Sequence, residues 1–284
     1  MRLKTIISLL LSGYLFLTIY LASAQESERR DIEFQALEPF QIFDNLYFVG
    51  IKAVASYVIE TSDGLILIDT LDGFEGFTDR LLSNIRELEL DPMDIKYVFI
   101  LQSHRDHYGG ALELQTHIDA LFGAAEEDWE VITNNLGDQA PRKDLILEDG
   151  SAITLGDTII NFEHTPGHTP GTTSIRFSVF DEGREHLAYF HGGSALRTDE
   201  PQAIQIFIDD LERIRQIPDI EVQIINHHDI HASGADDLLQ MKETYDVHPL
   251  QMFQVRQKES LSLVRKKYSK QCAVVVSCSF SYSL

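Results

Sequence analysis

The stretch "LQSHRDHYGG", residues 101–110, follows directly on the apolar run "IKYVFI" at residues 95–100. A near-continuous apolar run of this kind is typical of a strand that is buried on both faces of a sheet. We therefore predict a strand over residues 95–104 that ends in a polar turn, where Gly109 and Gly110 let the backbone pack closely. In α/β proteins, the carboxyl ends of such strands are common places for functional sites.

Four side chains of this stretch are suited to binding a metal ion. Gln102 and His104 are two residues apart, so on a strand both would point the same way, and Asp106 and His107 follow in the turn. A polar turn with solvated histidines is the simpler alternative, but two imidazoles and a carboxylate this close together favour a metal site. Gln102 stands where an imidazole would be the better ligand, because a neutral amide oxygen binds zinc weakly.

Two later segments also deliver histidines at the ends of predicted strands. The segment "HTPGHTPG" contains two Pro-Gly pairs, which make a tight and rigid loop around His164 and His168. We expect His164 to form hydrogen bonds in a buried position rather than to bind metal. The segment "INHHDIHASG" ends another predicted strand and contains His227, His228 and His231.

Short β-rich segments dominate both halves of the chain, and helices accompany them. Examples of predicted strands are residues 172–180 and 185–192, and apolar residues recur at helical spacing over 77–88 and 202–217. Two β-rich halves with helices outside predict an α/β fold of two packed sheets covered by helices, a four-layer αβ/βα sandwich.

These ordered motifs resemble those of the metallo-β-lactamase superfamily over most of residues 40–272. "DGLILIDT" is similar to an early strand of that family with a structural aspartate, here Asp69. "QSHRDHYGGA" resembles the family's HxHxDH motif, with Gln102 in the first histidine position. "HTPGHTPGT" and "INHHDIHASG" resemble two further motifs, and the resemblance places their metal ligands at His168 and His227.

The resemblance implies two zinc ions in each chain. The first zinc would bind Gln102, His104 and His168, and the second would bind Asp106, His107 and His227. Zinc ions in such a pair activate water for attack on a carbonyl group, and Asp106 would orient that water as well as bind metal. Because of Gln102, we expect the first zinc to bind more weakly than the second, and the second site alone could be enough for activity.

Ser194, in the segment "YFHGGSAL", separates branches of this family. Many members, such as glyoxalase II and the lactonases, have a metal-bridging aspartate at this place, and the first two subclasses of zinc β-lactamases have a cysteine. A serine combined with an Asp-His-His second site resembles the third subclass of zinc (class B) β-lactamases. Some members of that subclass resemble this chain in having a glutamine at the position of Gln102. The resemblance implies a β-lactamase with Asp106 and Ser194 as catalytic residues. For Ser194, a loop hydroxyl that only caps a turn is the alternative.

Two other functions remain alternatives at this stage. One is a hydrolase of the same fold that acts on another ester, a lactone or a thioester. The other is a non-catalytic periplasmic zinc-binding protein with a decayed site. His191 and His231 could line the pocket and replace the missing imidazole.

Weaker expectations concern the remaining histidines and one aromatic segment. We expect surface or helix-packing positions for His117, His186 and His248. Residues 121–143, which include Phe122 and Trp129, could form a loop over the site.

The first 24 residues are typical of a secretory signal peptide. A basic start is followed by an apolar run and by the small-residue sequence "ASA" before Gln25. An N-terminal membrane anchor is the alternative, since a membrane span needs about 20 apolar residues. We expect cleavage, a periplasmic or secreted protein, and no membrane attachment afterwards. The predicted divisions are a signal peptide at 1–24, a linker at 25–39, a metallo-β-lactamase domain at 40–272 and a tail of unknown role at 273–284.

The composition of the 284-residue chain limits its partners. A formal net charge of −22 argues against nucleic acid, because phosphate binding requires clustered lysines and arginines. The 44% of hydrophobic residues are ample for a buried core. We also expect a monomer that acts on a small molecule. Cys272 and Cys278 could form one disulfide, and without a CxxC pair a thiolate zinc site is not expected.

Overall fold

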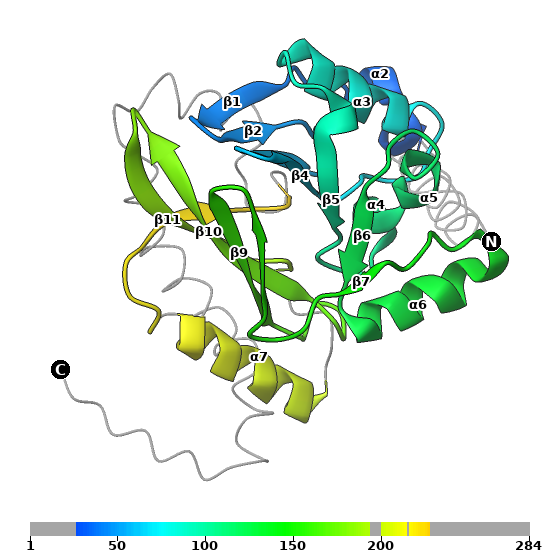
Figure 1. Ribbon diagram of the computed structural model, residues 1–284. Coiled ribbons are helices and arrows are strands. Elements are labelled where there is room, and N and C mark those ends of the chain that lie inside the picture. Colours follow the sequence, from blue (N-terminus) through cyan, green and yellow to red (C-terminus); the bar gives the residue numbers. More distant parts are fainter. Residues whose placement is uncertain (1–26, 194–199, 215, 228–284) are drawn as a thin grey trace, which may run out of the picture.

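The computed structural model describes residues 27–193, 200–214 and 216–227 of the chain (Figure 1). These residues form two β-sheets that pack face to face, and helices cover the outer side of each sheet. The predicted four-layer αβ/βα sandwich is therefore confirmed.

The first sheet has seven strands in the order β1-β2-β3-β4-β5-β6-β7. Each neighbouring pair from β1 through β4 is antiparallel, whereas each neighbouring pair from β4 through β7 is parallel. The strand bounds are Phe40–Phe43 (β1), Leu46–Phe48 (β2), Tyr57–Thr61 (β3), Gly64–Ile68 (β4), Ile95–Phe99 (β5), Leu121–Ala124 (β6) and Leu145–Ile146 (β7).

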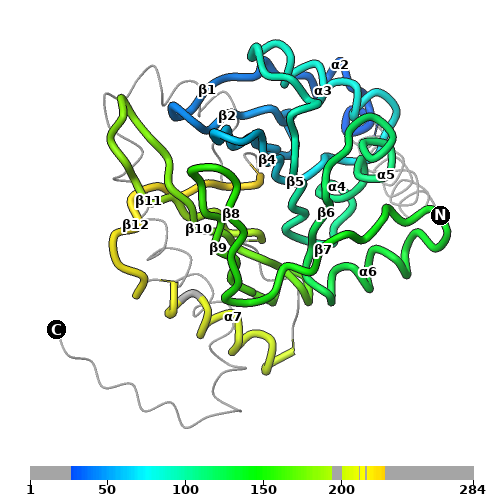
Figure 2. The backbone as a smooth tube through the Cα atoms, viewed as in Figure 1, coloured from blue at the N-terminus to red at the C-terminus, as the bar shows by residue number. Residues whose placement is uncertain are grey.

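The second sheet has five strands in the order β12-β11-β10-β9-β8. All its pairs are antiparallel except β11 with β12, and Figure 2 shows these strands as one layer beside the first sheet. The strand bounds are Ala152–Leu155 (β8), Thr158–His164 (β9), Thr173–Asp181 (β10), Arg184–Phe190 (β11) and Ile220–Ile224 (β12).

Amphipathic helices cover the outer faces of both sheets. Helix α3 buries Phe77, Leu81 and Ile85, spaced at four residues so that they form one apolar stripe against the first sheet. Helix α7 covers the second sheet (Figure 1), and no helix in the described ranges is both long and apolar enough to cross a membrane. The helix bounds are Ile32–Gln35 (α2), Phe77–Glu87 (α3), Arg105–Tyr108 (α4), Ala111–Leu114 (α5), Glu126–Leu136 (α6) and Pro201–Ile214 (α7), with 3₁₀ turns at Pro92–Asp94 (η1) and Gly137–Gln139 (η2).

Aromatic side chains join the two sheets across the central core. The rings of Phe99 and Phe162 meet edge to face with centroids 5.0 Å apart, and Tyr57 meets Phe190 at 5.5 Å. Each pair takes one ring from each sheet, so these contacts hold the layers together in the geometry that aromatic rings prefer.

The predicted strand over residues 95–104 is too long at its carboxyl end, because β5 stops at Phe99. The backbone N–H of Leu101 donates to the carboxylate of Asp69 at 2.9 Å instead of continuing the sheet. The carbonyl of Leu101 accepts from the N–H of Thr173, which begins β10 in the second sheet. The chain therefore leaves the first sheet before Gln102, and strand alternation does not orient this side chain.

The prediction of a loop over the site at residues 121–143 is wrong. Phe122 lies in β6 and Trp129 lies in α6, and both are buried between the first sheet and its helices. The indole N–H of Trp129 donates to the carbonyl of Leu145 at 2.9 Å, which fixes α6 on the sheet edge. Large apolar side chains at these positions stabilise the core rather than cover a pocket.

The expectation for His186 is also wrong, whereas His117 is exposed as predicted. His186 lies in β11 with only 1% of its surface exposed, and its Nδ1 is 3.0 Å from a carboxylate oxygen of Glu221. The positions of His228, His231, His248, Cys272 and Cys278 lie outside the described residues, as do the predicted signal peptide and tail.

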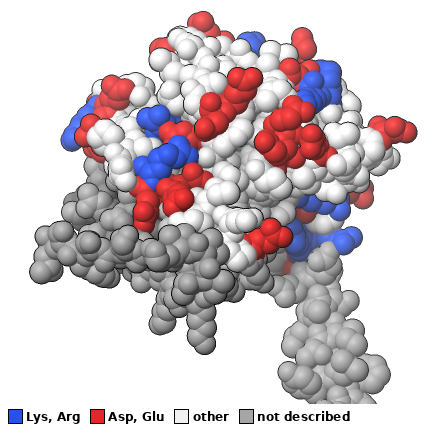
Figure 3. All heavy atoms as spheres, turned by 90° about the horizontal axis from the view of Figure 1, so that it is seen from below, with Lys and Arg blue, Asp and Glu red and all other residues white. Residues whose placement is uncertain are grey.

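Acidic side chains gather in several groups on the face shown in Figure 3, and basic side chains there form small groups, some of them beside acidic ones. This distribution agrees with the net charge of −22. A high net charge of one sign favours solubility.

The two neighbouring isoleucines of β9 test the core between the sheets. Ile160 is fully buried there, whereas Ile159 is 52% exposed. Ile160→Ala should lower the free energy of unfolding by about 2–5 kcal/mol, because it leaves a cavity, and Ile159→Ala should change it by less than about 1 kcal/mol. Urea unfolding of both variants measures the difference, and equal losses would contradict the described packing.

Candidate metal centre

Asp69 connects three elements around the site. It follows the end of β4 with φ of 61°, a left-handed conformation that Asp tolerates better than most residues. Its carboxylate accepts the N–H of Leu101 at 2.9 Å and lies 2.7 Å from Nδ1 of His107 on α4. Its own N–H donates to the carbonyl of Phe99, so the ends of β4, β5 and the start of α4 are fixed together.

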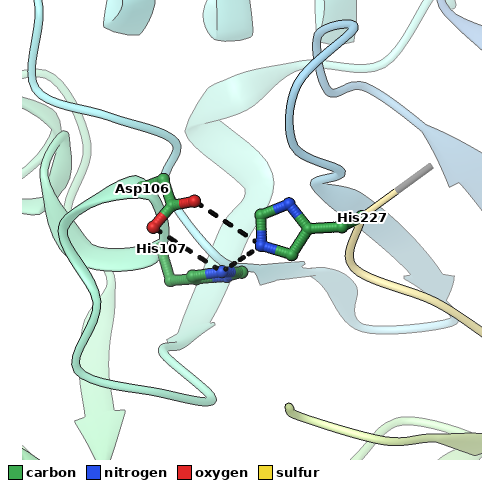
Figure 4. A group of neighbouring side chains, drawn as sticks. All are labelled: Asp106, His107 and His227. Carbon is green, nitrogen blue, oxygen red and sulfur yellow. Dashed lines mark hydrogen bonds and ion pairs between the residues drawn. The ribbon is translucent and has the colours of Figure 1, made fainter. Parts of the chain in front are cut away.

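Asp106, His107 and His227 form a first cluster of potential metal ligands (Figure 4), here called the carboxylate triad. The first two belong to α4, and His227 follows β12 of the other sheet. The Nε2 atoms of the two imidazoles are 3.2 Å apart, and the Asp106 carboxylate oxygens lie 3.9 and 3.5 Å from them. The predicted ligands of one metal are thus close together, although they come from both sheets.

The hydrogen bonds of the two imidazoles fit a bound cation. Nδ1 of His227 donates to the carbonyl of Ala53 at 2.9 Å, and Nδ1 of His107 donates to Asp69. In the neutral rings both Nε2 atoms then carry lone pairs that face each other at 3.2 Å. Facing lone pairs repel unless a cation lies between them, and partners on Nδ1 of this kind are typical of metal-ligating histidines.

The electrostatics of this triad keep its carboxylate ionised. Burial alone would raise the pKa of Asp106, but the imidazoles of His107 and His227, together with Arg29, lower it overall. For His107, burial lowers the pKa, but attraction to the carboxylate of Asp69 outweighs burial and raises it overall. An ionised carboxylate beside two imidazoles is a donor set that suits zinc.

Gln102, His104 and His168 form a second cluster, here called the amide triad. The amide oxygen of Gln102 lies 2.6 Å from Nδ1 of His104, which in turn lies 3.1 Å from Nε2 of His168. The amide nitrogen of Gln102 donates to the carbonyl of Gly192 at 3.0 Å, so the oxygen faces the two imidazoles. The same carbonyl accepts from the side chain of Asn226. Gln102 is fully buried and is held with its acceptor toward the site.

The glycine pair of "YFHGGSAL" lets the backbone approach the amide triad. A Cβ atom at Gly193 would lie 2.6 Å from the ring of His168, and one at Gly192 would lie 2.1 Å from the carbonyl of Thr173. Larger residues would therefore displace His168 or the start of β10. The predicted catalytic residue Ser194 lies outside the described residues, so its role stays a prediction.

Two other histidines lie near these loops but in different surroundings. Nε2 of His164 is 2.7 Å from the carbonyl of Leu147, which agrees with the expected hydrogen-bonding role, but the residue is half-buried rather than buried. The possibility that His191 lines the pocket is not realised, because its buried ring packs against Tyr189 and Phe207 and is not part of the cavity wall. Burial in these surroundings lowers the pKa of His191 to about 4.

A cavity of about 600 Å³ opens above the two triads, a size suited to a small molecule. Its wall includes residues of the segment that was expected to be a linker. Asp31 caps α2 by accepting the N–H groups of Glu33 and Phe34, a signal that could have predicted this short helix. The lining residues are Glu28, Arg29, Phe34, Gln35, Ile51, Ala53, Val54, Asp72, Phe77, His104, Arg105, Asp106, His168 and His227.

Arg29 and Arg105 were not recognised in the sequence as residues of the site. The guanidinium group of Arg29 lies 3.6 Å from Asp72 and 3.9 Å from Asp106, and that of Arg105 lies 3.0 Å from Asp72. These pairs bring positive charge to the rim of an otherwise acidic site. Isolated arginines carry no recognisable spacing, so only the fold reveals them.

Residues 49–179 match the family model described as "Metallo-beta-lactamase superfamily". This chain carries a metallo-beta-lactamase superfamily domain. The domain resembles the crystal structure of BJP-1, a subclass B3 metallo-beta-lactamase of Bradyrhizobium japonicum, with 27% identity and a TM-score of 0.69 over 85% of this chain and 97% of that one. It also resembles the metallo-beta-lactamase GOB-18 from Elizabethkingia meningoseptica, with 25% identity and a TM-score of 0.69 over 84% and 94% of the two chains.

Another relative of this metallo-beta-lactamase superfamily domain is not named a β-lactamase. The chain is 32% identical over 144 residues to the hydroxyacylglutathione hydrolase GloC of Haemophilus influenzae. The matched region is 45% of this chain and 63% of that relative. The chain thus spans less than two thirds of this relative's length, and its match to the lactamase-like protein aptB of Emericella nidulans spans 41% of that protein.

Gln102→His should raise the affinity of the amide triad for zinc, because an imidazole nitrogen is a better zinc ligand than an amide oxygen. Zinc titration against a chromophoric chelator should show tighter binding at the amide triad of this variant and unchanged binding at the carboxylate triad. An unchanged affinity and stoichiometry would show that Gln102 is not a ligand.

Asp69→Asn should weaken zinc binding at the carboxylate triad by about 10–100-fold, because His107 loses its charged partner. Asn also tolerates the left-handed backbone at this position. The same titration measures the change. Asp91→Asn is a suitable control, since the exposed side chain of Asp91 accepts the N–H of Met93 at a 3₁₀ turn. Equal affinities in the two variants would contradict the role given to Asp69.

Proposed function

We propose that this protein is a zinc-dependent hydrolase that opens the β-lactam ring, with two zinc ions per chain. The lining of one cavity by members of both triads carries this proposal. Similarity to the metallo-beta-lactamases BJP-1 and GOB-18 supports the substrate class. Ser194, in place of a bridging Asp or a Cys, adds the support of the sequence.

The residues of the chain divide the chemistry of this proposed reaction between them. Bound zinc supplies water activated as a nucleophile and a Lewis acid for the carbonyl group. The ionised carboxylate of Asp106 binds metal and accepts a hydrogen bond from the attacking group, which orients that group. The apolar wall at Ile51, Val54 and Phe77 receives the acyl part of the substrate and limits access of bulk water. Ser194 would bind the substrate.

A thioester hydrolase is the second candidate. The 32% identity to a hydroxyacylglutathione hydrolase favours it, because the name of that relative indicates hydrolysis of a glutathione thioester. The cavity and its metal ligands suit attack on either carbonyl, and fold alone does not choose the substrate. In either case we propose a periplasmic or secreted protein, on the basis of the signal-like residues 1–24.

Purified protein loaded with zinc should hydrolyse nitrocefin, a chromogenic cephalosporin, and removal of zinc by a chelator should abolish this activity. The zinc-dependent rise in absorbance measures turnover. A parallel assay with a glutathione thioester and a lactone tests the second candidate.

The outcomes separate the candidate functions. Turnover of the thioester without turnover of nitrocefin would reject the β-lactamase and support the second candidate. Bound zinc with no turnover of any of the three substrates would indicate a non-catalytic zinc-binding protein.

A further inference from the structure

Asp128 is a buried carboxylate that belongs to neither triad. It lies in the first turn of α6 and is fully buried, with no exposed surface. A buried carboxylate is costly unless hydrogen bonds satisfy it. Its oxygens accept the hydroxyl of Ser103 at 2.7 Å, the hydroxyl of Thr169 at 2.9 Å and the N–H of Gly171 at 3.0 Å. Burial raises its pKa, and these hydrogen bonds offset that shift only in part.

The hydrogen-bond partners of Asp128 are direct neighbours of the amide triad. Ser103 lies between Gln102 and His104 in the chain, and Thr169 follows His168. One carboxylate therefore holds together the two loops that carry all three members of the triad. A third element, α6, supplies that carboxylate, so the distance between the loops is set by a helix anchored in the core through Trp129.

The loop of His168 is shaped to meet this carboxylate. A Cβ atom at Gly171 would lie 2.7 Å from the backbone nitrogen of Asp128, so glycine is required for the approach. The hydroxyl of Thr172 accepts the N–H of Thr169 at 2.8 Å, which closes the turn after His168. The Pro-Gly pairs of this segment thus make a loop that fits against the start of α6.

We infer that Asp128 is a positioning residue for the metal site of the amide triad. It sets the separation of Gln102 and His104 from His168, although it touches none of the three ligand atoms. The inference rests on the metal site of the proposed function. Such positioning matters most here because an amide oxygen is a weak ligand, and a weak donor contributes only when it is already in place.

The effect of Asp128 should be selective for one of the two sites. The carboxylate triad is oriented by other groups, Asp69 for His107 and the carbonyl of Ala53 for His227. Loss of Asp128 therefore leaves those contacts intact. A purely structural role would weaken both sites together.

Asp128→Asn should weaken zinc binding at the amide triad by about 10–100-fold and leave the carboxylate triad unchanged. The asparagine keeps the size of the side chain and one acceptor oxygen, but it offers an N–H₂ group where the hydroxyl of Thr169 needs an acceptor. Stepwise titration with Zn²⁺ against a chromophoric chelator measures both affinities, and the visible spectrum of the Co²⁺-loaded protein reports the geometry of each site.

Two milder variants and a control accompany this substitution. Thr169→Val removes the hydroxyl that binds Asp128 and should weaken the same site, whereas Thr169→Ser keeps a hydroxyl and should restore it. Asp144→Asn is the matched control, because Asp144 accepts the N–H of Phe122 and pairs with Arg142 away from both triads. This control should leave both zinc affinities unchanged.

The measurement separates this inference from the proposed function, because zinc binding is measured without substrate. A selective loss at the amide triad supports the inference even if no substrate is turned over. Equal weakening of both sites, or unchanged affinities in Asp128→Asn and Thr169→Val, would overturn it. If Asp128→Asn does not fold, the two Thr169 variants decide the question by themselves.

Discussion

The carboxylate of Asp69 is the contact on which the site depends most. It accepts the N–H of Leu101, which therefore does not pair within the sheet, and it orients the ring of His107. The first contact ends β5 and directs the chain toward the second sheet, and the second directs Nε2 of His107 toward His227. One buried charge thus couples the end of a strand to the orientation of a metal ligand, and the left-handed backbone at Asp69 is the conformation that permits it.

The two triads are oriented by different kinds of partner. The carboxylate triad relies on a charged group and a backbone carbonyl, and it contains a carboxylate of its own. The amide triad has a neutral oxygen donor, held by the carbonyl of Gly192, and depends on the carboxylate of Asp128 for the spacing of its loops. Because of this difference in charge, we expect the carboxylate triad to bind metal more tightly than the amide triad.

Much of the fold followed from hydrophobic patterns in the sequence. The apolar run at residues 95–100, the helical spacing at 77–88 and the turn-separated strands of the second half all occur as elements at nearly those positions. The predicted strand extended too far beyond β5 because the N–H of Leu101 bonds to the side chain of Asp69 rather than to the backbone of a neighbouring strand. Hydrophobic periodicity does not reveal a hydrogen bond of this kind. The misplacement of Trp129 arose because the loop expected at residues 121–143 rested on position in the chain alone, and position does not show that Phe122 and Trp129 pack in the core.

The candidate ligands were also predicted, because histidines follow the predicted strands and the resemblance to the metallo-β-lactamase superfamily implied which of these residues bind metal. The structure brings Gln102, His104 and His168 together, and likewise Asp106, His107 and His227. Apart from Asp69, the groups that support these ligands were not predicted. The contacts of Asp128 and Arg29 join segments far apart in the chain, and neither residue has a distinctive spacing.

The proposed function requires two adjacent zinc sites of unequal strength. An anomalous-difference map from crystals grown at limiting zinc tests it most directly. We expect a strong peak between Asp106, His107 and His227 and a weaker one between Gln102, His104 and His168. Equal peaks at both places, or zinc at neither triad, would contradict it.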